Sequence, residues 1–284
     1  MNLVTLKEVL GPAEKGNYAV GAFNANNMEI VQAIVEAAVE ERSPVILQAS
    51  QGAIRYAGLE HIVSLVKTAA QGTDLPVVLH LDHGTDFSQV MRCIRHGFSS
   101  VMYDGSAHTL EDNIATTCRV MEVARAVGVS VEGELGKIGG TEDDVSVDER
   151  DALYTDPDEA RRFVEETGID ALAIAIGTAH GPYKGEPKLD FDRLKRIREL
   201  TGVSIVMHGA SGVPAASIKK GIELGVRKIN IDTELRQAFT RGLKSFLENN
   251  PDNIDPRKIL SPAKEAMKAV VKEKMRLFGC AGRA

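Results

Sequence analysis

Short apolar runs recur along the chain, and each is followed by a segment with helical periodicity. The runs are rich in Val, Ile, Leu and Ala, and they occupy residues 18–24, 44–50, 76–83, 99–106, 129–136, 171–178, 204–211 and 228–234. Near-continuous apolar character is typical of parallel strands that are covered on both faces. Strand followed by helix, eight times over, predicts an α/β protein with a closed (β/α)8 TIM barrel.

The segments between these runs place apolar residues at helical spacing, as in "MEIVQAIVEAAVEE" (28–41) and "LEHIVSLVKTAA" (59–70). An open doubly wound sheet is the alternative, but it usually shows G-x-G-x-x-G after the first strand, and "GAFNANN" does not match. Beyond about residue 241 the chain is helical, with a break at "NNPDNIDPRKILSP". We therefore expect residues 1–284 to form a single barrel domain with a C-terminal helical extension, and residues 136–151 to form a mobile acidic loop.

Composition narrows the class of protein. The 284 residues are 43% apolar and 26% charged, which is ordinary for a globular protein. A formal net charge of −6 and the lack of a basic run argue against nucleic-acid binding. The three cysteines are far apart, so we expect no disulfide framework and a cytoplasmic location. The start "MNLVTLKEVL" does not resemble a signal peptide, and the apolar run "ALAIAIGTA" is too short to span a membrane.

Ionisable residues collect where the apolar runs end, as in "HLDHGTD" at residues 80–86. Burying such groups is costly unless something pairs with them. In a barrel all these ends face one rim, where active sites lie. His83, His180 and His208 occupy equivalent positions, and three histidines with an open position are typical of catalytic zinc. A single histidine is more often structural, and we assign that role to the others, His61, His80, His96 and His108.

Glycine-rich pieces follow the later runs and predict a phosphate site. In "GTAHGPYKG" and "HGASGVP", backbone N–H groups can bind oxyanions, and "NIDTE" places Thr233 before a helix. Lys184 adds a positive charge. Asp104 and Glu134 bring carboxylates to the same rim, where they can hold a second cation or orient histidines. We expect Glu132, two residues before Glu134, to be solvated.

Together these segments resemble the class II, zinc-dependent ketose-bisphosphate aldolases, which include fructose-1,6-bisphosphate and tagatose-1,6-bisphosphate aldolases. The similarity runs from "NLVTLKEVL" to "GCAGRA" and includes "HLDHG", "VEGELGKIGGTEDD", "GTAHGPYKGEP", "HGASGVP" and "KINIDTE". It implies reversible cleavage of the sugar bisphosphate to dihydroxyacetone phosphate and an aldehyde. It also implies a homo-oligomer, a dimer or tetramer, with no nucleic-acid or membrane partner.

The resemblance also implies residue roles. His83, His180 and His208 would bind Zn²⁺, and Asp82 would give its proton to the aldehyde oxygen in the synthetic direction. Glu142 matches a loop carboxylate that moves the carbon-bound proton. Asp104 and Glu134 match ligands of a second divalent cation, and a monovalent cation (Na⁺ or K⁺) often lies near the phosphate. We expect substrate contacts at Asn24, Ser50, Gly181, Lys184, Gly209, Ala210, Ser211, Asn230, Ile231, Asp232, Thr233, Asp255 and Arg257, with Arg257 contributed by a neighbouring subunit in some members.

Two substrate epimers and two other functions remain open at this point. "GPYKGEP" looks like the fructose branch, whereas "LQAS", "DVSVDERDALYTDP" and "GCAGRA" look like the tagatose branch. A metal-dependent barrel hydrolase would use metal-bound water and would lack two phosphate loops beside the metal. A non-catalytic sugar-phosphate binding barrel should have lost Asp82 or a histidine, and the chain keeps both. We favour cleavage of fructose 1,6-bisphosphate.

Overall fold

Eight parallel strands close into a barrel, as predicted. The computed structural model describes residues 3–142, 145–147, 153–183 and 185–284. The strands follow one another around the barrel in the order β1-β11-β10-β8-β5-β4-β3-β2. Their bounds are β1 Val20–Asn24, β2 Val45–Ser50, β3 Val77–Gly84, β4 Ser100–Tyr103, β5 Ser130–Leu135, β8 Ala171–Ile174, β10 Ser204–Met207 and β11 Val226–Ile231. Every one of these strands is buried along its whole length, which is why its sequence is apolar without alternation.

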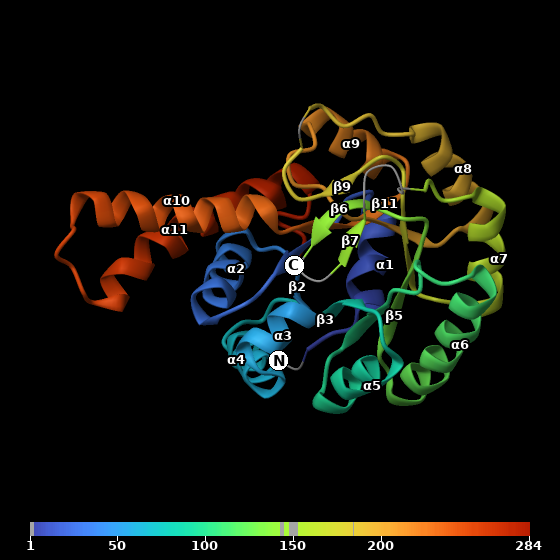
Figure 1. Ribbon diagram of the computed structural model, residues 1–284, viewed down its shortest axis with the longest axis horizontal. Coiled ribbons are helices and arrows are strands. Elements are labelled where there is room, and N and C mark those ends of the chain that lie inside the picture. Colours follow the sequence, from blue (N-terminus) through green and yellow to red (C-terminus); the bar gives the residue numbers. More distant parts are fainter. Residues whose placement is uncertain (1–2, 143–144, 148–152, 184) are drawn as a thin grey trace.

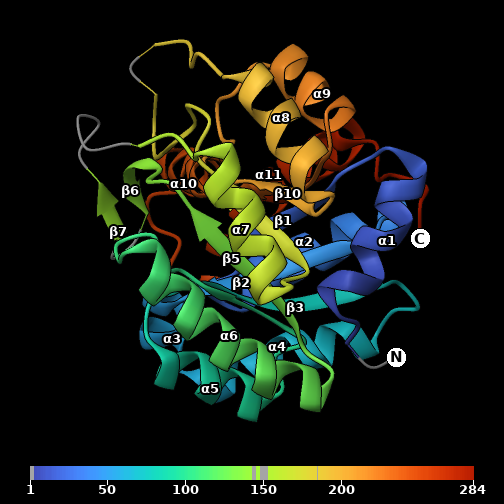
Figure 2. The ribbon, with the colours of Figure 1, turned by 90° about the vertical axis from the view of Figure 1, so that its right-hand side faces the viewer.

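Helices surround the barrel and cover the outer faces of its strands (Figure 2). They are α1 Leu6–Gly16, α2 Met28–Glu41, α3 Gln51–Ala57, α4 Leu59–Gln71, α5 Phe87–His96, α6 Leu110–Val127, α7 Pro157–Thr167, α8 Phe191–Thr201 and α9 Ala215–Glu223. Many begin at a side chain that accepts a first-turn N–H, as Asp86 does for α5 and Asp156 for α7. Several end at a glycine in the left-handed region, such as Gly128 after α6. The pattern of apolar residues did not predict α1 or α3.

The predicted C-terminal extension is a helical arm that projects from the barrel. It consists of α10 (Thr233–Asn249) and α11 (Pro256–Phe278), which run out and back beside each other (Figure 1). The returning helix packs against α2, and Lys264 Nζ lies 2.8 Å from Glu36 Oε1. The break between the helices covers only residues 250–255, because Pro256 begins α11 at a position where proline is tolerated.

The acidic segment after β5 differs from the irregular loop that we expected. Its described part contains two short strands, β6 (Gly139–Glu142) and β7 (Val145–Val147), paired in antiparallel fashion. β6 also pairs in parallel with β9 (Ala179–His180), so a small second sheet lies beside the barrel. Residues 143–144 and 148–152 lie outside the described part. Among the described helices, none is long and apolar enough to cross a membrane.

Candidate functional site

The end of β3 places two neighbouring side chains in the same site. In a regular strand Asp82 and His83 would point to opposite faces of the sheet. His83 instead has φ of 48°, and the pairing of β3 with β4 shifts register between Leu81 and Gly84. A left-handed conformation at a residue other than glycine costs energy and is characteristic of functional sites. Here it lets both Asp82 and His83 reach the rim of the barrel.

The three predicted histidines meet at the carboxyl ends of the strands. The ring of His83 lies 4.7 Å from that of His208 and 5.2 Å from that of His180, centroid to centroid. One ligand atom from each residue lies within 4.8 Å of the other two, and all three side chains are buried. His180 comes from β9 rather than from a barrel strand, and the small second sheet carries it to the rim.

Hydrogen bonds around these rings favour a cation between them. His83 Nδ1 lies 2.9 Å from Asp104 Oδ2, and His208 Nε2 lies 2.9 Å from Glu132 Oε1. Carboxylates only accept, so these contacts place the ring protons on His83 Nδ1 and His208 Nε2. The remaining nitrogens, His83 Nε2 and His208 Nδ1, then face each other with their lone pairs at 3.0 Å. Two lone pairs at that distance repel unless a metal ion binds both, so the donor set fits a metal.

A second possible ligand group shares His83 and adds Asp104 and Glu134. Burial would raise the pKa of Asp104, but hydrogen bonds from His83 and Ser106 outweigh it and hold the pKa below its usual value. Burial, followed by the nearby charge of Asp104, raises the pKa of Glu134 well above its usual value. Glu134 Oε2 has no hydrogen-bond partner among the described residues. A buried carboxylate oxygen without a donor, next to a second carboxylate, is the environment that a cation would satisfy.

Three amide side chains donate hydrogen bonds to Asp82. Its Oδ2 accepts from Asn24 Nδ2 at 3.2 Å and from Gln48 Nε2 at 2.9 Å. Its Oδ1 accepts from Asn230 Nδ2 at 3.3 Å. Asn24 and Asn230 were predicted site residues, whereas Gln48 was not. All four side chains are buried, so the carboxylate has a fixed orientation at the bottom of the site.

Glu132 is not the solvated residue that we expected. It is fully buried inside the barrel, because residues two apart on a strand share a face and Glu134 points inward. Burial would raise its pKa, but the charge of Lys228 and the hydrogen bond from His208 hold that pKa well below the usual value. Burial lowers the pKa of His208 and lowers that of His80 well below its usual value, so both rings are neutral near pH 7. A neutral imidazole is the form that binds metal.

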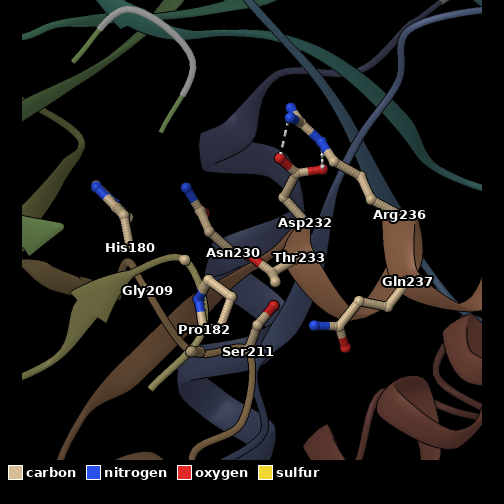
Figure 3. Close-up of a pocket in the computed structure, with 11 residues that line it drawn as sticks. His180, Pro182, Gly209, Ser211, Asn230, Asp232, Thr233, Arg236 and Gln237 are labelled. Carbon is tan, nitrogen blue, oxygen red and sulfur yellow. Dashed lines mark hydrogen bonds and ion pairs between the residues drawn. The ribbon is translucent and has the colours of Figure 1, made fainter. Parts of the chain in front are cut away.

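Most of the predicted phosphate residues line one cavity of about 320 Å³ (Figure 3). Gly181 and Gly209 have positive φ values of 86° and 63°, conformations that glycine adopts without strain. A Cβ at Gly209 would lie 2.5 Å from the carbonyl oxygen of Ala179, which leaves no room for a larger residue. The cavity is lined by His180, Gly181, Pro182, Gly209, Ala210, Ser211, Asn230, Asp232, Thr233, Arg236 and Gln237.

Other predicted residues do not line this cavity within the described part of the chain. Ser50 ends β2 and its hydroxyl caps α3, where it accepts from Ala53 N. The side chain of Ile231 is buried in the hydrophobic core, so only its backbone is available to a substrate. Lys184 lies outside the described residues. Glu142 ends β6, and its backbone is paired with Val145.

Asp255 and Arg257 belong to the start of α11. The turn from α10 into α11 lies at the end of the arm, away from the barrel (Figure 1). Asp255 caps α11 and forms an ion pair with Arg257 at 2.9 Å. The side chain of Arg257 is 90% exposed. Within one chain, therefore, the structure does not bring these two residues to the site.

The sequence analysis missed Arg236 and Gln237, which line the cavity from the first turns of α10. The guanidinium of Arg236 forms a bidentate pair with Asp232, at 2.8 Å from Nε to Oδ1 and 2.7 Å from Nη2 to Oδ2 (Figure 3). Their position could have been inferred, because Arg236 is four residues after Asp232 and Gln237 is four residues after Thr233, and residues four apart share a face of a helix.

The hairpin of β6 and β7 gives a first prediction. Gly140 has φ of 96° and pairs with His180, and a Cβ at this position would overlap the carbonyl oxygen of His180. Gly140→Ala should therefore push the hairpin away from β9 and lower turnover by roughly 10²-fold, as displacements near 1 Å can. Gly11→Ala is the control, because a Cβ at Gly11 meets no atom of the described residues within 4 Å. Wild-type turnover in Gly140→Ala would show that the pairing does not matter.

Comparison with known proteins agrees with this geometry. The family model described as "Fructose-bisphosphate aldolase class-II" matches residues 4–283. A fructose-bisphosphate aldolase of Geobacillus stearothermophilus is 50% identical over 287 residues, covering 100% of this chain and 99% of that protein. The D-tagatose-1,6-bisphosphate aldolase subunit GatY of Klebsiella oxytoca is 46% identical, covering 99% of each chain. The crystal structure of the YdjI aldolase from Escherichia coli K12 aligns with a TM-score of 0.87 at 35% identity, covering 99% of each chain.

The fold and site define a barrel lyase in which buried histidines and carboxylates adjoin a glycine-lined cavity at the carboxyl ends of the strands. The chain belongs to the class-II fructose-bisphosphate aldolase family. It is an enzyme, an aldolase that breaks and forms a carbon–carbon bond.

Proposed function

We propose that this enzyme reversibly cleaves fructose 1,6-bisphosphate to dihydroxyacetone phosphate and glyceraldehyde 3-phosphate. The observation that carries the proposal is the position of His180, which belongs to the three-histidine ligand group and also lines the glycine-rich cavity. A ketose phosphate anchored in that cavity through its phosphate would therefore present its carbonyl group to the histidine centre. The relatives from Geobacillus and Thermus that are named fructose-bisphosphate aldolase, each 50% identical, support the same substrate.

The histidine group would hold Zn²⁺, because three clustered imidazole nitrogens match the ligands that zinc prefers. Bound there, the ion would polarise the substrate ketone and stabilise the negative charge that develops beside it. Asp104 and Glu134, which lie beside His83, would hold a second divalent cation through their carboxylate oxygens. We also propose that a monovalent cation, Na⁺ or K⁺, accompanies the phosphate.

The cavity suits a phosphate although the chain carries a net charge of −6. Helix α10 begins at Thr233, which lines the cavity, so the positive end of the helix dipole lies beside it. Gly181, Gly209 and Ser211 add backbone N–H groups from two loops. We propose that these groups bind the phosphate next to the ketone, with Lys184 as an added point charge.

Two carboxylates would move the protons. Asp82 would accept the proton of the C4 hydroxyl as the C3–C4 bond breaks, and return it to the aldehyde oxygen in synthesis. Asn24, Gln48 and Asn230 orient its carboxylate for that transfer. Glu142 would move the proton on carbon, because the pairing of Gly140 with His180 brings the hairpin that carries it beside the ligand group.

The arm supports an oligomer in which one chain completes the site of another. Ser50 lies at the rim, whereas Arg257 is exposed at the end of the arm and too remote to act in its own chain. We therefore propose a homodimer or tetramer in which Asp255 and Arg257 act at the site of a neighbouring subunit, contacting the far end of the sugar. We further propose that residues 1–284 form one domain, and that three separated free cysteines fit the reducing cytoplasm.

Tagatose 1,6-bisphosphate is the second candidate substrate, and it differs in configuration at C4. The Klebsiella relative named for it is 46% identical, and the "LQAS" and "GCAGRA" segments resemble that branch. Assays on both bisphosphates separate the two, since an enzyme selective for one epimer should show a higher kcat/KM for it. A higher value for tagatose 1,6-bisphosphate would replace our substrate assignment.

Metal dependence tests the proposed mechanism directly. Excess chelator followed by dialysis should abolish cleavage of fructose 1,6-bisphosphate, and added Zn²⁺ should restore it. Borohydride in the presence of substrate should trap no adduct, because Lys228 is fully buried and paired with Glu132 rather than open to a ketone. Full activity in metal-free protein, or a lysine adduct, would contradict the proposal.

A further inference from the structure

A column of polar side chains fills the barrel interior beneath the three histidines. It consists of His80 from β3, Ser100 from β4, Glu132 from β5 and Lys228 from β11, and each of them is 0% exposed. The interior of such a barrel is ordinarily packed with branched apolar side chains. Burying a carboxylate and an ammonium costs several kcal/mol per ion, roughly, before their attraction is counted. None of these four residues lines the substrate cavity.

The contacts inside this column are directional. Lys228 Nζ donates to Glu132 Oε2 at 2.8 Å and lies 3.4 Å from His80 Nε2. His80 Nδ1 lies 2.7 Å from Ser100 Oγ, which ends the column on the side away from the histidine centre. One oxygen of Glu132 is therefore committed to Lys228, and the carboxylate cannot rotate without breaking a buried ion pair.

The other oxygen of Glu132 acts on the metal ligands. Glu132 Oε1 accepts from His208 Nε2 at 2.9 Å, so the proton of that ring is kept on Nε2. The nitrogen left without a proton is Nδ1, which faces His83 Nε2 at 3.0 Å. Without an acceptor at Glu132, the His208 ring could carry its proton on Nδ1 or turn about its Cβ–Cγ bond.

We propose that Glu132 is a positioning residue of the metal centre, which fixes the tautomer and orientation of His208, and that Lys228 fixes Glu132 in turn. This inference rests on the metal centre of the proposed function. Outer partners that orient a histidine ligand contribute about 10–100-fold to metal affinity.

The amide variant Glu132→Gln tests whether residue 132 determines which nitrogen of His208 carries the proton. Lys228 only donates, so it will select the carbonyl oxygen of the new glutamine and turn the amide NH₂ toward His208 Nε2. His208 must then accept at Nε2 and carry its proton on Nδ1, the atom that should bind metal. Zn²⁺ affinity, measured by chelator competition, should fall about 10–100-fold. The visible absorption of the Co²⁺-substituted protein should change as well.

Removing the lysine should reverse this defect. In the double variant Glu132→Gln, Lys228→Met the glutamine can turn its carbonyl oxygen toward His208, so we expect metal affinity to recover in part. Loss of a merely structural contact would not be relieved by removing its partner. Ser100→Ala is the matched control, because Ser100 is buried in the same column but contacts His80 and not His208. It should keep wild-type affinity and the wild-type Co²⁺ spectrum.

The outcomes separate this inference from the proposed function. Wild-type affinity in Glu132→Gln, or no recovery in the double variant, would overturn it while leaving the proposed reaction intact. If wild-type protein binds neither Zn²⁺ nor Co²⁺, the proposed centre is wrong as well. If Glu132→Gln does not fold, the Gln–Met double variant is compared with Glu132→Met, Lys228→Met. The glutamine form should then bind Zn²⁺ about 10-fold more tightly, and equal affinities would overturn the inference.

Discussion

The variant His180→Ala should remain folded yet lose both its metal and its turnover. His180 lies on β9, outside the barrel strands, and its backbone pairing with Gly140 does not depend on its side chain. Truncation removes one of three clustered nitrogen ligands, so metal affinity should fall further than the roughly 10–100-fold that an outer partner costs. The free energy of unfolding should fall by only about 1 kcal/mol, which is typical of a single substitution.

Metal content after gel filtration and a thermal melt measure the two halves of this prediction. His108→Ala serves as the control, because His108 is exposed and belongs to neither ligand group. It should keep metal, turnover and melting temperature. Retention of a full complement of metal by His180→Ala, with normal turnover, would remove His180 from the ligand group and leave the role of the histidine centre without support.

The sequence predicted the barrel because its strands are buried on both faces. Burial of this kind produces the apolar runs that mark β2 or β3, and a left-handed glycine such as Gly97 ends the helix before the next strand. The topology then brings His83 and His208 to one rim, since His83 lies at the end of β3 and His208 directly follows β10. The positions of His83 and His208 therefore follow from the apolar runs in the sequence together with the closure of the sheet into a barrel.

The positions of His180 and Glu132 could not be predicted from the local sequence pattern. His180 lies six residues beyond β8, so its place at the rim depends on a pairing between β9 and β6 that has no apolar signature. Glutamate is usually exposed in proteins, so the residue type alone predicts an exposed position for Glu132. Its burial follows from sharing a strand face with Glu134, and the lysine that balances it, Lys228, is almost a hundred residues away. Long-range charge pairing of this kind leaves no periodic trace in a sequence.

For the helical arm, the sequence predicted the helices but not the location of Arg257 relative to the site. Helical periodicity predicted α10 and α11, and a proline and acidic break predicted the turn between them. Nothing in that pattern places Arg257 relative to the site, because its position in one chain is at the exposed end of the arm. Its partner within the chain is Asp255, two residues away, and that contact says nothing about the active site.

The variant Asp82→Ala should keep its metal and lose carbon–carbon bond cleavage. The amides of Asn24, Gln48 and Asn230 donate to the Asp82 carboxylate, and Asp82 belongs to neither possible ligand group, so we expect the three histidines to stay in place without it. Without a group to accept the C4 hydroxyl proton, turnover should fall by about 10²–10⁴-fold, the usual range for a lost general acid or base. Exchange of the carbon-bound proton of dihydroxyacetone phosphate with solvent should suffer much less, because that step uses a different proton.

Gln48→Met is the matched control, because Gln48 orients the Asp82 carboxylate but cannot itself transfer a proton. Gln48 is fully buried and donates to both Asp82 and Asn24, at 2.9 and 2.7 Å, but its amide does not titrate. Its loss should lower turnover less than Asp82→Ala does, because the carboxylate keeps its bonds from Asn24 and Asn230. Metal content, cleavage rate and proton exchange, measured on both variants, decide the matter. Should Asp82→Ala lose its metal along with its activity, the carboxylate would belong to the ligand group, and the hydroxyl proton would have to be moved by another residue.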